Sequence, residues 1–386
     1  MHAVHVITRL IVGGAQENTL LTCEGLVRRG WKVTLLTGPT TGPEGSLLPR
    51  AQAGGYQTIV IPNLVRDPAP RRDWRARTEL WEAFHALSPD VIHTHSSKAG
   101  VLGREAAWVL KGPLVIHTIH GLPFHPYQRL FVRMMWKNFE RRAARHCDAI
   151  FSVADAMTRQ ALAAGVGRPE QFTTVYSGME IEPFLHPPAG ADAVRAGLKI
   201  PRKSLVFGVI ARLQPLKGHD DLMAIAPRLF TAEPNAHYLF IGDGALRARL
   251  EETARLRGVA HRITFTGLVP PEQIPALLPA MDVLVHPSYR EGLARALPQG
   301  ALAGKPVISY DCDGAAEACI HGITGLLVKT GDTAALLAAM LQLAGDGALR
   351  GRFGSAGRAF CRERFSAETM VDKISARYGE LLAAQL

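Results

Sequence analysis

The sequence predicts an α/β protein made of two doubly wound, Rossmann-like domains that face each other across a cleft. Short runs rich in β-branched residues alternate with helix-length segments along almost all of the 386 residues. This alternation predicts parallel sheets with helices on both faces. The chain is too long for one such sheet, and a stretch rich in Pro, Gly and Ala interrupts the alternation at 187–204. We therefore expect one domain on each side of this linker.

The expected elements follow in order along the chain. The strands expected in the first domain are residues 2–8, 32–38, 58–63, 90–96, 113–121, 149–154 and 172–178. The strands expected in the second domain are residues 205–213, 236–244, 262–268, 283–288 and 305–311. Helical segments lie between them, for example 18–30 and 245–258. We accordingly place the N-terminal domain at 1–187, the second domain at 200–365 and a final helical segment at 366–386.

The composition is that of a cytoplasmic globular protein. No apolar run reaches the roughly 20 residues that a membrane-spanning helix needs, and the run at 335–345 predicts a packed helix instead. The N-terminus has no basic leader before a long apolar core, so it predicts the first strand and not a signal peptide. The five cysteines are scattered without the spacing of a zinc site, which favours a reducing compartment.

The charge of the chain favours anionic partners. The net charge is +10, and both halves of the chain are basic. Such a surface suits nucleoside diphosphates and phospholipid headgroups; no recognised nucleic-acid-binding module accompanies it, so we expect no nucleic-acid partner. In the basic, aromatic segment 124–148, the apolar residues have helical spacing and are expected in the core. The basic face of this helix is either solvated or lies on anionic lipid at the inner face of the membrane. The expected core residues of this segment are Leu130, Met134, Trp136 and Phe139.

The functional residues are expected in the loops after the strands, because ligands of open parallel sheets bind beyond the carboxyl ends of the strands. Gly13 and Gly14 follow the first strand and allow close backbone approach to a phosphate, although a tight turn alone would also explain them. Arg212 and Lys217 lie in one loop, where a guanidinium and an ammonium can hold the oxygens of one diphosphate. The alternative is that both are solvated.

A histidine, His120, follows an apolar strand at the expected edge and could donate a hydrogen bond to a sugar hydroxyl. Other histidines lie near it in the sequence, but no carboxylate accompanies them, so we expect no metal site. These histidines are His93, His95, His117 and His125. The segment around Asp311 and Asp313 contains a metal-type Asp-x-Asp pattern, which we interpret as a solvated loop.

Together these motifs resemble a family-4 glycosyltransferase with the GT-B fold, of the type that builds bacterial surface polysaccharides or exopolysaccharides. The resemblance covers essentially the whole chain. It rests on the order and spacing of segments such as GGAQENTLL, DVIHTHSSKAGVLGR, IHTIHG, CDAIFSVADAM, VYSGME, ARLQPLKG, IGDGALRARLEE, VLVHPSYREGL and GITGLLV. It implies a retaining, metal-independent enzyme without a cofactor, whose final segment 366–386 is a helix that returns to the first domain.

The resemblance also implies roles for the catalytic residues. Arg212 and Lys217 would neutralise the departing nucleoside diphosphate, which a metal does in other enzymes. Glu291 would accept hydrogen bonds from hydroxyls of the donor sugar, and His120 would contact that sugar from the first domain.

Further residues would bind the donor nucleotide. Gly13 and Gly14 would let the first domain approach the phosphates, and the backbone around Val269 would contact the base. The remaining contacts would come from the amides at the start of a helix that Glu291 opens, namely Gly292, Leu293 and Ala294.

The family pattern has a second glutamate eight residues after Glu291, for the ribose hydroxyls, and this chain has Gln299 there. Eight helical residues rise about 12 Å, roughly the distance from a donor sugar to its ribose. A neutral amide loses a charge-assisted hydrogen bond, worth roughly 1.5–3 kcal/mol against roughly 1 for a neutral one. We therefore expect about tenfold weaker nucleotide binding and, because Pro298 lacks an N–H, a kink in this helix.

The resulting hypothesis is a hexosyltransferase that moves a sugar from a nucleoside-diphosphate sugar, with UDP favoured by frequency alone, to a hydroxyl of a carbohydrate or lipid-linked acceptor. Two alternatives remain. One is a GT-B nucleotide-sugar epimerase, which would need acid–base carboxylates that we do not find in these loops. The other is a non-catalytic protein that binds nucleotide-sugar or partners another transferase.

Overall fold

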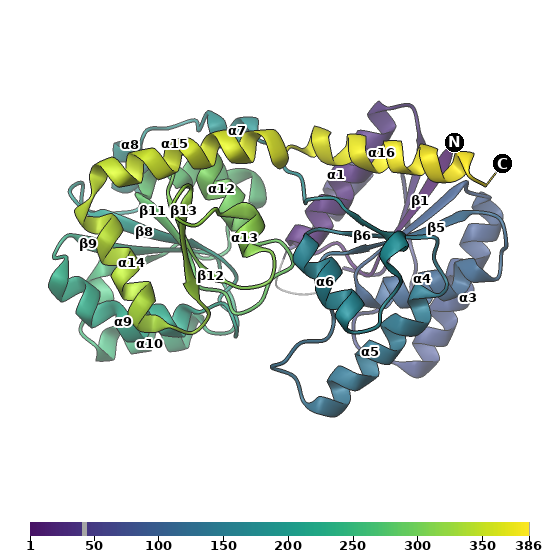
Figure 1. Cartoon of the computed structure of the whole chain (residues 1–386), viewed down its shortest axis with the longest axis horizontal. Helices are drawn as coiled ribbons and strands as arrows, with labels where there is room; N and C mark the ends of the chain where they lie inside the picture. Colours follow the sequence, from purple (N-terminus) through teal and green to yellow (C-terminus); the bar gives the residue numbers. More distant parts are fainter. Residues whose placement is uncertain (41–44, 386) are drawn as a thin grey trace. The chain divides into compact units, whose positions relative to one another are not determined.

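The computed structural model describes residues 1–40 and 45–385 and contains two compact units, each built on a parallel sheet (Figure 1). The first unit comprises Met1–Met179 and Ser366–Leu386, and the second comprises Glu180–Phe365. The chain thus leaves the first unit before the linker placed at 187–204, and the helix Ala191–Gly197 within that linker belongs to the second unit. The final segment belongs to the first unit.

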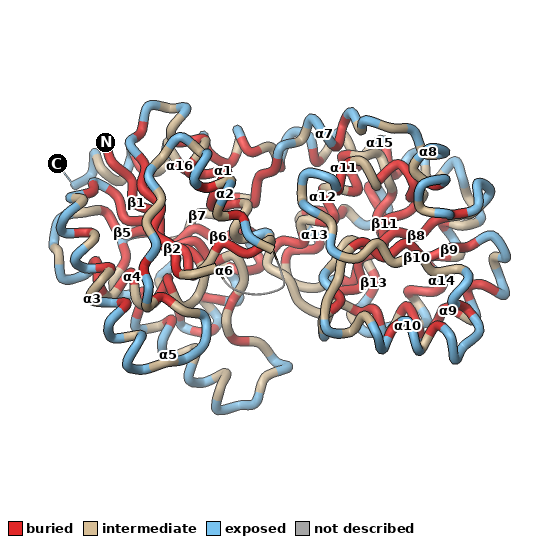
Figure 2. The backbone as a smooth tube through the Cα atoms, turned by 180° about the vertical axis from the view of Figure 1, so that it is seen from behind, coloured by how far each residue is buried: buried red, intermediate tan, exposed pale blue. Residues whose placement is uncertain are grey.

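The first unit contains a seven-stranded sheet in the order β3-β2-β1-β4-β5-β6-β7, in which every pairing is parallel. The strands are β1 His2–Ile7, β2 Lys32–Thr37, β3 Gln57–Val60, β4 Val91–His95, β5 Leu114–Ile119, β6 Ala149–Ser152 and β7 Phe172–Thr174. The central strands β1, β4 and β5 are buried along their whole length, as Figure 2 shows. Strands covered on both faces are rich in apolar and β-branched residues, which is why the sequence predicted these strands, although each of them also contains histidine.

Helices cover both faces of this sheet. Helices α1 and α16 lie on one face, and α3, α4 and α5 lie on the other (Figure 1). The helices of this unit are α1 Gly14–Arg28, α2 Leu48–Ala53, α3 Pro70–Leu87, α4 Ser97–Trp108, α5 Leu130–Ala144, α6 Asp155–Ala163, the short 3₁₀ helix Pro169–Gln171, and α16 Ala367–Ala383. A Cβ at Gly25 of α1 would lie 2.6 Å from Cγ2 of Val371. The glycine therefore lets α1 and α16 pack closely and fixes the last helix to the first unit.

The second unit contains a six-stranded parallel sheet in the order β10-β9-β8-β11-β12-β13. The strands are β8 Leu205–Ile210, β9 Ala236–Ile241, β10 Ile263–Phe265, β11 Val283–His286, β12 Val307–Asp311 and β13 Gly325–Lys329. Every strand predicted in either half is present, and β13 is an additional one. It is an edge strand that begins with Gly325 and follows a turn that contains Gly322, so its short apolar run carries a weak strand signal.

Helices α9, α10 and α14 lie on one face of the second sheet, and α12 and α15 lie on the other (Figure 1). The helices are α7 Glu182–Leu185, α8 Ala191–Gly197, α9 His219–Ala232, α10 Arg247–Leu256, α11 Ile274–Leu277, α12 Ala296–Leu302, α13 Ala315–Ala318, α14 Thr333–Gly345 and α15 Gly347–Arg364, with 3₁₀ turns at Ala260–Arg262, Pro271–Gln273 and Leu278–Ala280. Helix α14 buries Leu336, Met340 and Leu343, which confirms the packed helix expected at 335–345. No helix among the described residues is long and apolar enough to cross a membrane.

Helix α5 differs from the sequence prediction. The buried residues of this helix are Glu140, Ala143 and Ala144. The apolar residues that we expected in the core are exposed or only partly buried, with Leu130 71% and Phe139 45% exposed. The prediction of a core face was wrong because α5 contacts α4 through its last turns, where small residues allow close packing, and leaves its first turns exposed (Figure 2).

Candidate active site

A glycine brings two loops of the second unit together at the carboxyl edge of its sheet. Gly218 precedes α9 and has φ +73°, and a Cβ there would lie 1.9 Å from the carbonyl oxygen of Pro287. Only glycine combines this backbone conformation with such a close approach. The loop before α9 is further held by the N–H of Tyr289, which donates to the carbonyl of Leu216 at 2.9 Å. The loops after β8 and β11 therefore form one structure.

This contact places an ion pair at the edge of the sheet. Nζ of Lys217 lies 2.5 Å from Oε1 of Glu291, and Nε2 of His286 lies 3.0 Å from the same oxygen. The side chains of Lys217 and Glu291 are only 19% and 16% exposed. Burial by itself would raise the pKa of Glu291, but the charge of Lys217 and the hydrogen bonds from His286 and Lys217 outweigh burial and hold the pKa well below its usual value. Glu291 is therefore an ionised carboxylate in a largely water-excluded site.

The backbone after Glu291 is not helical, which corrects the prediction that Glu291 opens a helix. The N–H of Glu291 donates to Oδ2 of Asp313 at 2.7 Å, and the N–H of Gly314 donates to the carbonyl of Gly292 at 3.2 Å. These bonds hold the chain in an irregular conformation until α12 begins at Ala296. The amides of residues 292–294 thus lie before the helix and not in its first turn.

Because the helix starts later than predicted, two further predictions, the helical rise from Glu291 to Gln299 and the kink at Pro298, are wrong. Gln299 is in α12, but only part of the segment from Glu291 to Gln299 is helical, so the predicted 12 Å helical rise does not apply. Pro298 lies in the first turn of α12, where an N–H has no partner within the helix. The expected kink is therefore wrong, because proline is tolerated at this position. No described residue hydrogen-bonds the Gln299 side-chain amide, which is partly buried.

Asp313 is a further correction, because we expected a solvated loop there. Its side chain is partly buried and bound to the backbone of Glu291. Its backbone has φ +48°, a conformation that aspartate adopts more readily than most residues. Sequence analysis also missed His286. The signal available for it was the one used for His120, a polar residue at the carboxyl end of an apolar strand.

The other predicted donor-binding residues of this unit lie in loops at the same edge of the sheet. Arg212 follows β8 and is exposed, and none of the described residues pairs with its guanidinium. Gly242 and Gly244 hold the loop after β9 against this segment, since a Cβ at either would lie within 2.4 Å of a carbonyl oxygen of Ala211 or Leu213. Val269 lies in the loop after β10 and is partly exposed. The structure thus joins Lys217 to Glu291 but does not join Arg212 to them.

In the first unit, the glycine pair and His120 lie at the carboxyl edge, as predicted. Gly13 caps α1 and Gly14 is its first residue, so the N-terminal N–H groups of this helix follow the loop after β1. His120 follows β5, and its Nε2 lies 3.0 Å from Nδ1 of His95.

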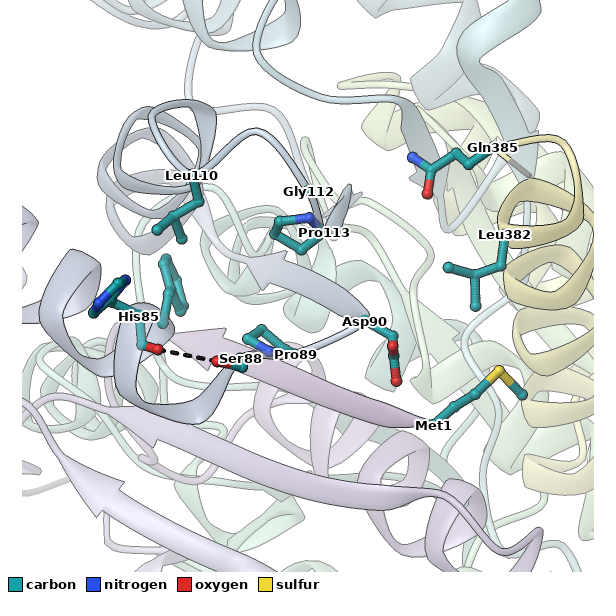
Figure 3. A pocket seen from close by; sticks show the side chains of 11 residues that line it. Met1, His85, Ser88, Pro89, Asp90, Leu110, Gly112, Pro113, Leu382 and Gln385 are labelled. Carbon is teal, nitrogen blue, oxygen red and sulfur yellow. Dashed lines mark hydrogen bonds between the residues drawn. The ribbon is translucent and has the colours of Figure 1, made fainter.

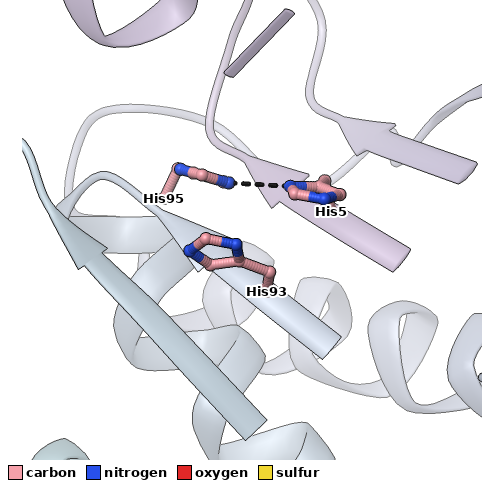
Figure 4. Close-up of side chains that lie close together, drawn as sticks. All are labelled: His5, His93 and His95. Carbon is pink, nitrogen blue, oxygen red and sulfur yellow. Dashed lines mark hydrogen bonds between the residues drawn. The ribbon is translucent and has the colours of Figure 1, made fainter. Parts of the chain in front are cut away.

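Three histidines of the first unit lie close enough to be considered as a metal site. The ring nitrogens of His5, His93 and His95 lie within 4.8 Å of one another (Figure 4), whereas neither His117 nor His125 joins this group in the described part of the chain. All the ring nitrogens except Nε2 of His5 have hydrogen-bond partners. A metal ligand must direct its lone pair at the ion, so an ion here would break several of these bonds. The geometry favours a hydrogen-bonded network over a metal centre.

A cavity of about 540 Å³ lies at the opposite edge of the first sheet, at the amino ends of its strands (Figure 3). Its lining includes Met1, Asp90 and Gly112, which precede β1, β4 and β5, and Leu382 near the end of the chain. None of the predicted site residues lines it. Because ligands of open parallel sheets bind at the carboxyl edge, we do not assign the active site to this cavity.

Two family models match this chain. The model described as Glycosyltransferase Family 4 matches residues 12–182, and the model described as Glycosyl transferases group 1 matches residues 191–360. The chain belongs to the family-4 glycosyltransferases. Known structures with the GT-B fold resemble this glycosyltransferase. The Anabaena protein HepE in complex with UDP and glucose aligns with a TM-score of 0.84 at 20% identity, over 98% of this chain and 99% of that one. Sucrose-phosphate synthase from Thermosynechococcus elongatus aligns with a TM-score of 0.80 at 22% identity, over 100% of both chains.

Characterised relatives support the enzymatic assignment. The Escherichia coli UDP-Gal:alpha-D-GlcNAc-diphosphoundecaprenol alpha-1,3-galactosyltransferase is 25% identical over 345 residues, covering 89% of this chain and 87% of the relative. The Streptomyces fradiae 2-deoxystreptamine N-acetyl-D-glucosaminyltransferase is 29% identical over 84% of this chain and 81% of its own length. The protein is therefore an enzyme, a glycosyltransferase that uses a nucleotide sugar.

Proposed function

We propose that this glycosyltransferase moves a hexose from a UDP-sugar to a hydroxyl of a lipid-linked glycan precursor, with retention of the anomeric configuration and without a metal ion. The observation that carries the proposal is the contact of Lys217 and Glu291 at the carboxyl edge of the second sheet. It supplies a cation for the leaving group and an ionised acceptor for sugar hydroxyls in one site.

In the proposed reaction the bond between the anomeric carbon and the diphosphate oxygen breaks, and that oxygen keeps the electron pair. Lys217 and Arg212 neutralise the charge that develops on the diphosphate. The Glu291 carboxylate accepts hydrogen bonds from sugar hydroxyls and so orients the anomeric carbon. The acceptor oxygen bonds to the face that the diphosphate leaves, and the acceptor proton departs with the nucleotide.

The nucleotide is proposed from the relatives. The E. coli relative is named for UDP-Gal, and HepE has been solved with UDP and with UDP-glucose. Other relatives, from Mycobacterium tuberculosis, are named as GDP-mannose-dependent. Side chains in the loop around Val269 do not distinguish the bases, so the choice of UDP over GDP is open to direct test.

We also propose that the enzyme meets its acceptor at an anionic membrane surface, through the first turns of α5. Much of the backbone there is exposed, as Figure 2 shows. This segment and the preceding loop carry exposed apolar side chains beside basic side chains that are exposed or partly exposed. The apolar residues of this α5 surface are Tyr127, Leu130, Phe131, Met134, Met135 and Phe139, and its basic residues are Arg129, Arg133 and Lys137. Such a helix lies in the interface with its apolar side chains inserted and its cations near lipid phosphates. The name of the E. coli relative, which includes a diphosphoundecaprenol, supports a lipid-linked acceptor.

The first test is the melting temperature of the purified protein with UDP, GDP and ADP in turn, each in EDTA. We expect stabilisation by UDP, because a ligand that binds only the folded state raises its stability. Stabilisation by GDP alone would overturn the choice of UDP, and a shift that appears only with added Mg²⁺ or Mn²⁺ would overturn metal independence. Transfer to a polyprenyl-diphosphate sugar, with NMR of the product linkage, then tests the acceptor and the retention.

The membrane proposal is tested by sedimentation with vesicles of phosphatidylglycerol at low salt. The double variant Leu130→Ser, Phe131→Ser removes exposed apolar groups and should lower the bound fraction several-fold. A matched control, Leu256→Ser, removes an apolar side chain that is also 71% exposed but lies in the second unit. Equal binding by the double variant and the control would overturn the role of α5.

A further inference from the structure

Three histidines of the first unit form a chain of hydrogen bonds that ends at His120. Nδ1 of His5 lies 2.9 Å from Nε2 of His95, and Nδ1 of His95 lies 3.0 Å from Nε2 of His120 (Figure 4 shows the first step). His5 is in β1, His95 is in β4 and His120 follows β5, and these are adjacent strands of the sheet. The chain therefore leads from the buried centre of the sheet to its carboxyl edge.

The strand register produces this diagonal arrangement. His5 is paired with His93 in β4, and His95 is two residues further on. His95 is paired with Thr118 in β5, and His120 is again two residues further on. Because side chains alternate between the two faces of a strand, each step of two residues keeps the next histidine on the same face. Each step also moves one strand across and closer to the edge.

The rings of His5 and His95 are neutral while they form this chain. His5 and His95 are almost completely buried. Burial lowers the pKa of His5 to about 3, and burial together with repulsion from the neighbouring imidazoles holds the pKa of His95 well below its usual value. A neutral imidazole has one N–H donor and one acceptor nitrogen. The chain can therefore run in only two directions.

The far end of the chain decides between these directions. Nε2 of His5 is buried and has no hydrogen-bond partner among the described residues. If the proton were on this nitrogen, a donor would be buried without an acceptor, which is rarer in proteins than an acceptor without a donor. The proton of His5 is therefore on Nδ1 and is donated to Nε2 of His95. His95 must then carry its own proton on Nδ1 and donate it to Nε2 of His120.

The neighbouring groups are satisfied by other bonds and do not compete. His93 lies between Oγ1 of Thr118 and the hydroxyl of Tyr378, at 2.7 Å and 2.5 Å. His117 is bound to Oγ1 of Thr94 at 3.0 Å.

We propose that His5 and His95 are positioning residues that hold His120 as a neutral imidazole protonated on Nδ1. Nε2 of His120 accepts the hydrogen bond from His95 and is closed to protonation, since a second proton there would place two N–H donors against each other. His120 then presents the Nδ1–H as a hydrogen-bond donor to an oxygen of the donor sugar. This role rests on the proposed sugar transfer, and it assumes the contact between His120 and the donor sugar that the family resemblance implies.

The tautomers are tested directly in the whole chain. NMR of the ¹⁵N-histidine-labelled protein near neutral pH, in EDTA, distinguishes Nδ1–H, Nε2–H and doubly protonated rings by their long-range couplings. Spectra of His95→Asn and His120→Asn variants assign the signals. We expect Nδ1–H for both His95 and His120. An Nε2–H signal or a doubly protonated ring at either residue would overturn the proposal, whatever reaction the protein catalyses.

The positioning role is tested by two variants at one residue. An asparagine at 95 carries its amide close to where Nδ1 of histidine lies and can still donate to His120, whereas His95→Leu has a similar shape and no donor. We expect His95→Leu to lower kcat about tenfold, as the loss of one positioning hydrogen bond does, and His95→Asn to recover most of this loss. Both should lower the melting temperature alike. Equal kcat values for His95→Leu and His95→Asn would overturn the role of His95 as a donor. A wild-type protein that transfers no sugar would instead overturn the proposed function and leave the tautomer result valid.

Discussion

Replacement of Glu291 by glutamine removes one negative charge from the site while the shape of the side chain is kept. In the wild type, Oε1 of Glu291 contacts both Lys217 and His286, and the Lys217 and Glu291 side chains are less than one-fifth exposed. Breaking a fully buried ion pair costs about 3–5 kcal/mol. Because this pair retains some exposure, we expect about 2 kcal/mol, which corresponds to a fall of roughly 4–8 °C in the melting temperature of the second unit.

Glu291→Gln should also lower the rate of sugar transfer. A carboxylate that accepts two sugar hydroxyls makes two charge-assisted hydrogen bonds, each about 1 kcal/mol stronger than a neutral one. The expected loss of about 2 kcal/mol is about 30-fold in kcat/KM. The measurement is steady-state transfer from the UDP-sugar identified by the melting experiment.

Glu363→Gln is the matched control, because Glu363 is an exposed glutamate of the same unit on α15. It should change neither the melting temperature nor kcat/KM. If Glu291→Gln retained kcat/KM within about twofold of the wild type, the assignment of Glu291 to the donor sugar would be wrong. If it left the melting temperature unchanged, the ion pair would not contribute to stability.

Three further predictions follow from the same loops. Lys217→Met removes the cation that lowers the pKa of Glu291. A carboxyl group with a depressed pKa in the folded state contributes stability above its unfolded pKa, near 4.5, and this stability is lost as pH falls through the folded pKa. The Lys217→Met variant should therefore be less stable at neutral pH and unfold at a higher pH during acid titration. An unchanged midpoint of acid unfolding would contradict the pairing of Lys217 with Glu291. Gln299→Glu should lower the Kd for UDP about tenfold by calorimetry, and an unchanged Kd would show that residue 299 does not contact the ribose. Gly218→Ala should destabilise the protein by more than about 2 kcal/mol and abolish transfer, because the Cβ would collide with Pro287. The control Gly351→Ala places its Cβ in open space on α15, so it should be neutral or slightly stabilising by thermal denaturation. Equal effects of the two substitutions would refute the role of Gly218 in joining the two loops.

The sequence by itself determined the fold and most of the positions at which the candidate functional residues lie. Central strands of a parallel sheet are buried on both faces, so they appear as short runs rich in apolar and β-branched residues. The residues after them are at the carboxyl edge by topology alone. Lys217, Glu291 and His120 were found in this way. Edge strand β13 was missed because its short run next to glycines carries a weak strand signal. The first turns of α5 were misjudged because periodicity shows which residues share a face but not whether another element covers that face.

Only the tertiary structure decided which side chains meet. The contact between Lys217 and Glu291 joins residues 74 positions apart, and it depends on Gly218 approaching Pro287 more closely than any local pattern reveals. The start of α12 is set by Asp313, which lies in a different loop and whose carboxylate accepts a hydrogen bond from the N–H of Glu291. The direction of the histidine chain depends on one buried nitrogen of His5 and on the register of adjacent strands. Hydrogen bonding and electrostatics act between atoms within a few ångströms in space, whereas sequence patterns report only the neighbours along the chain.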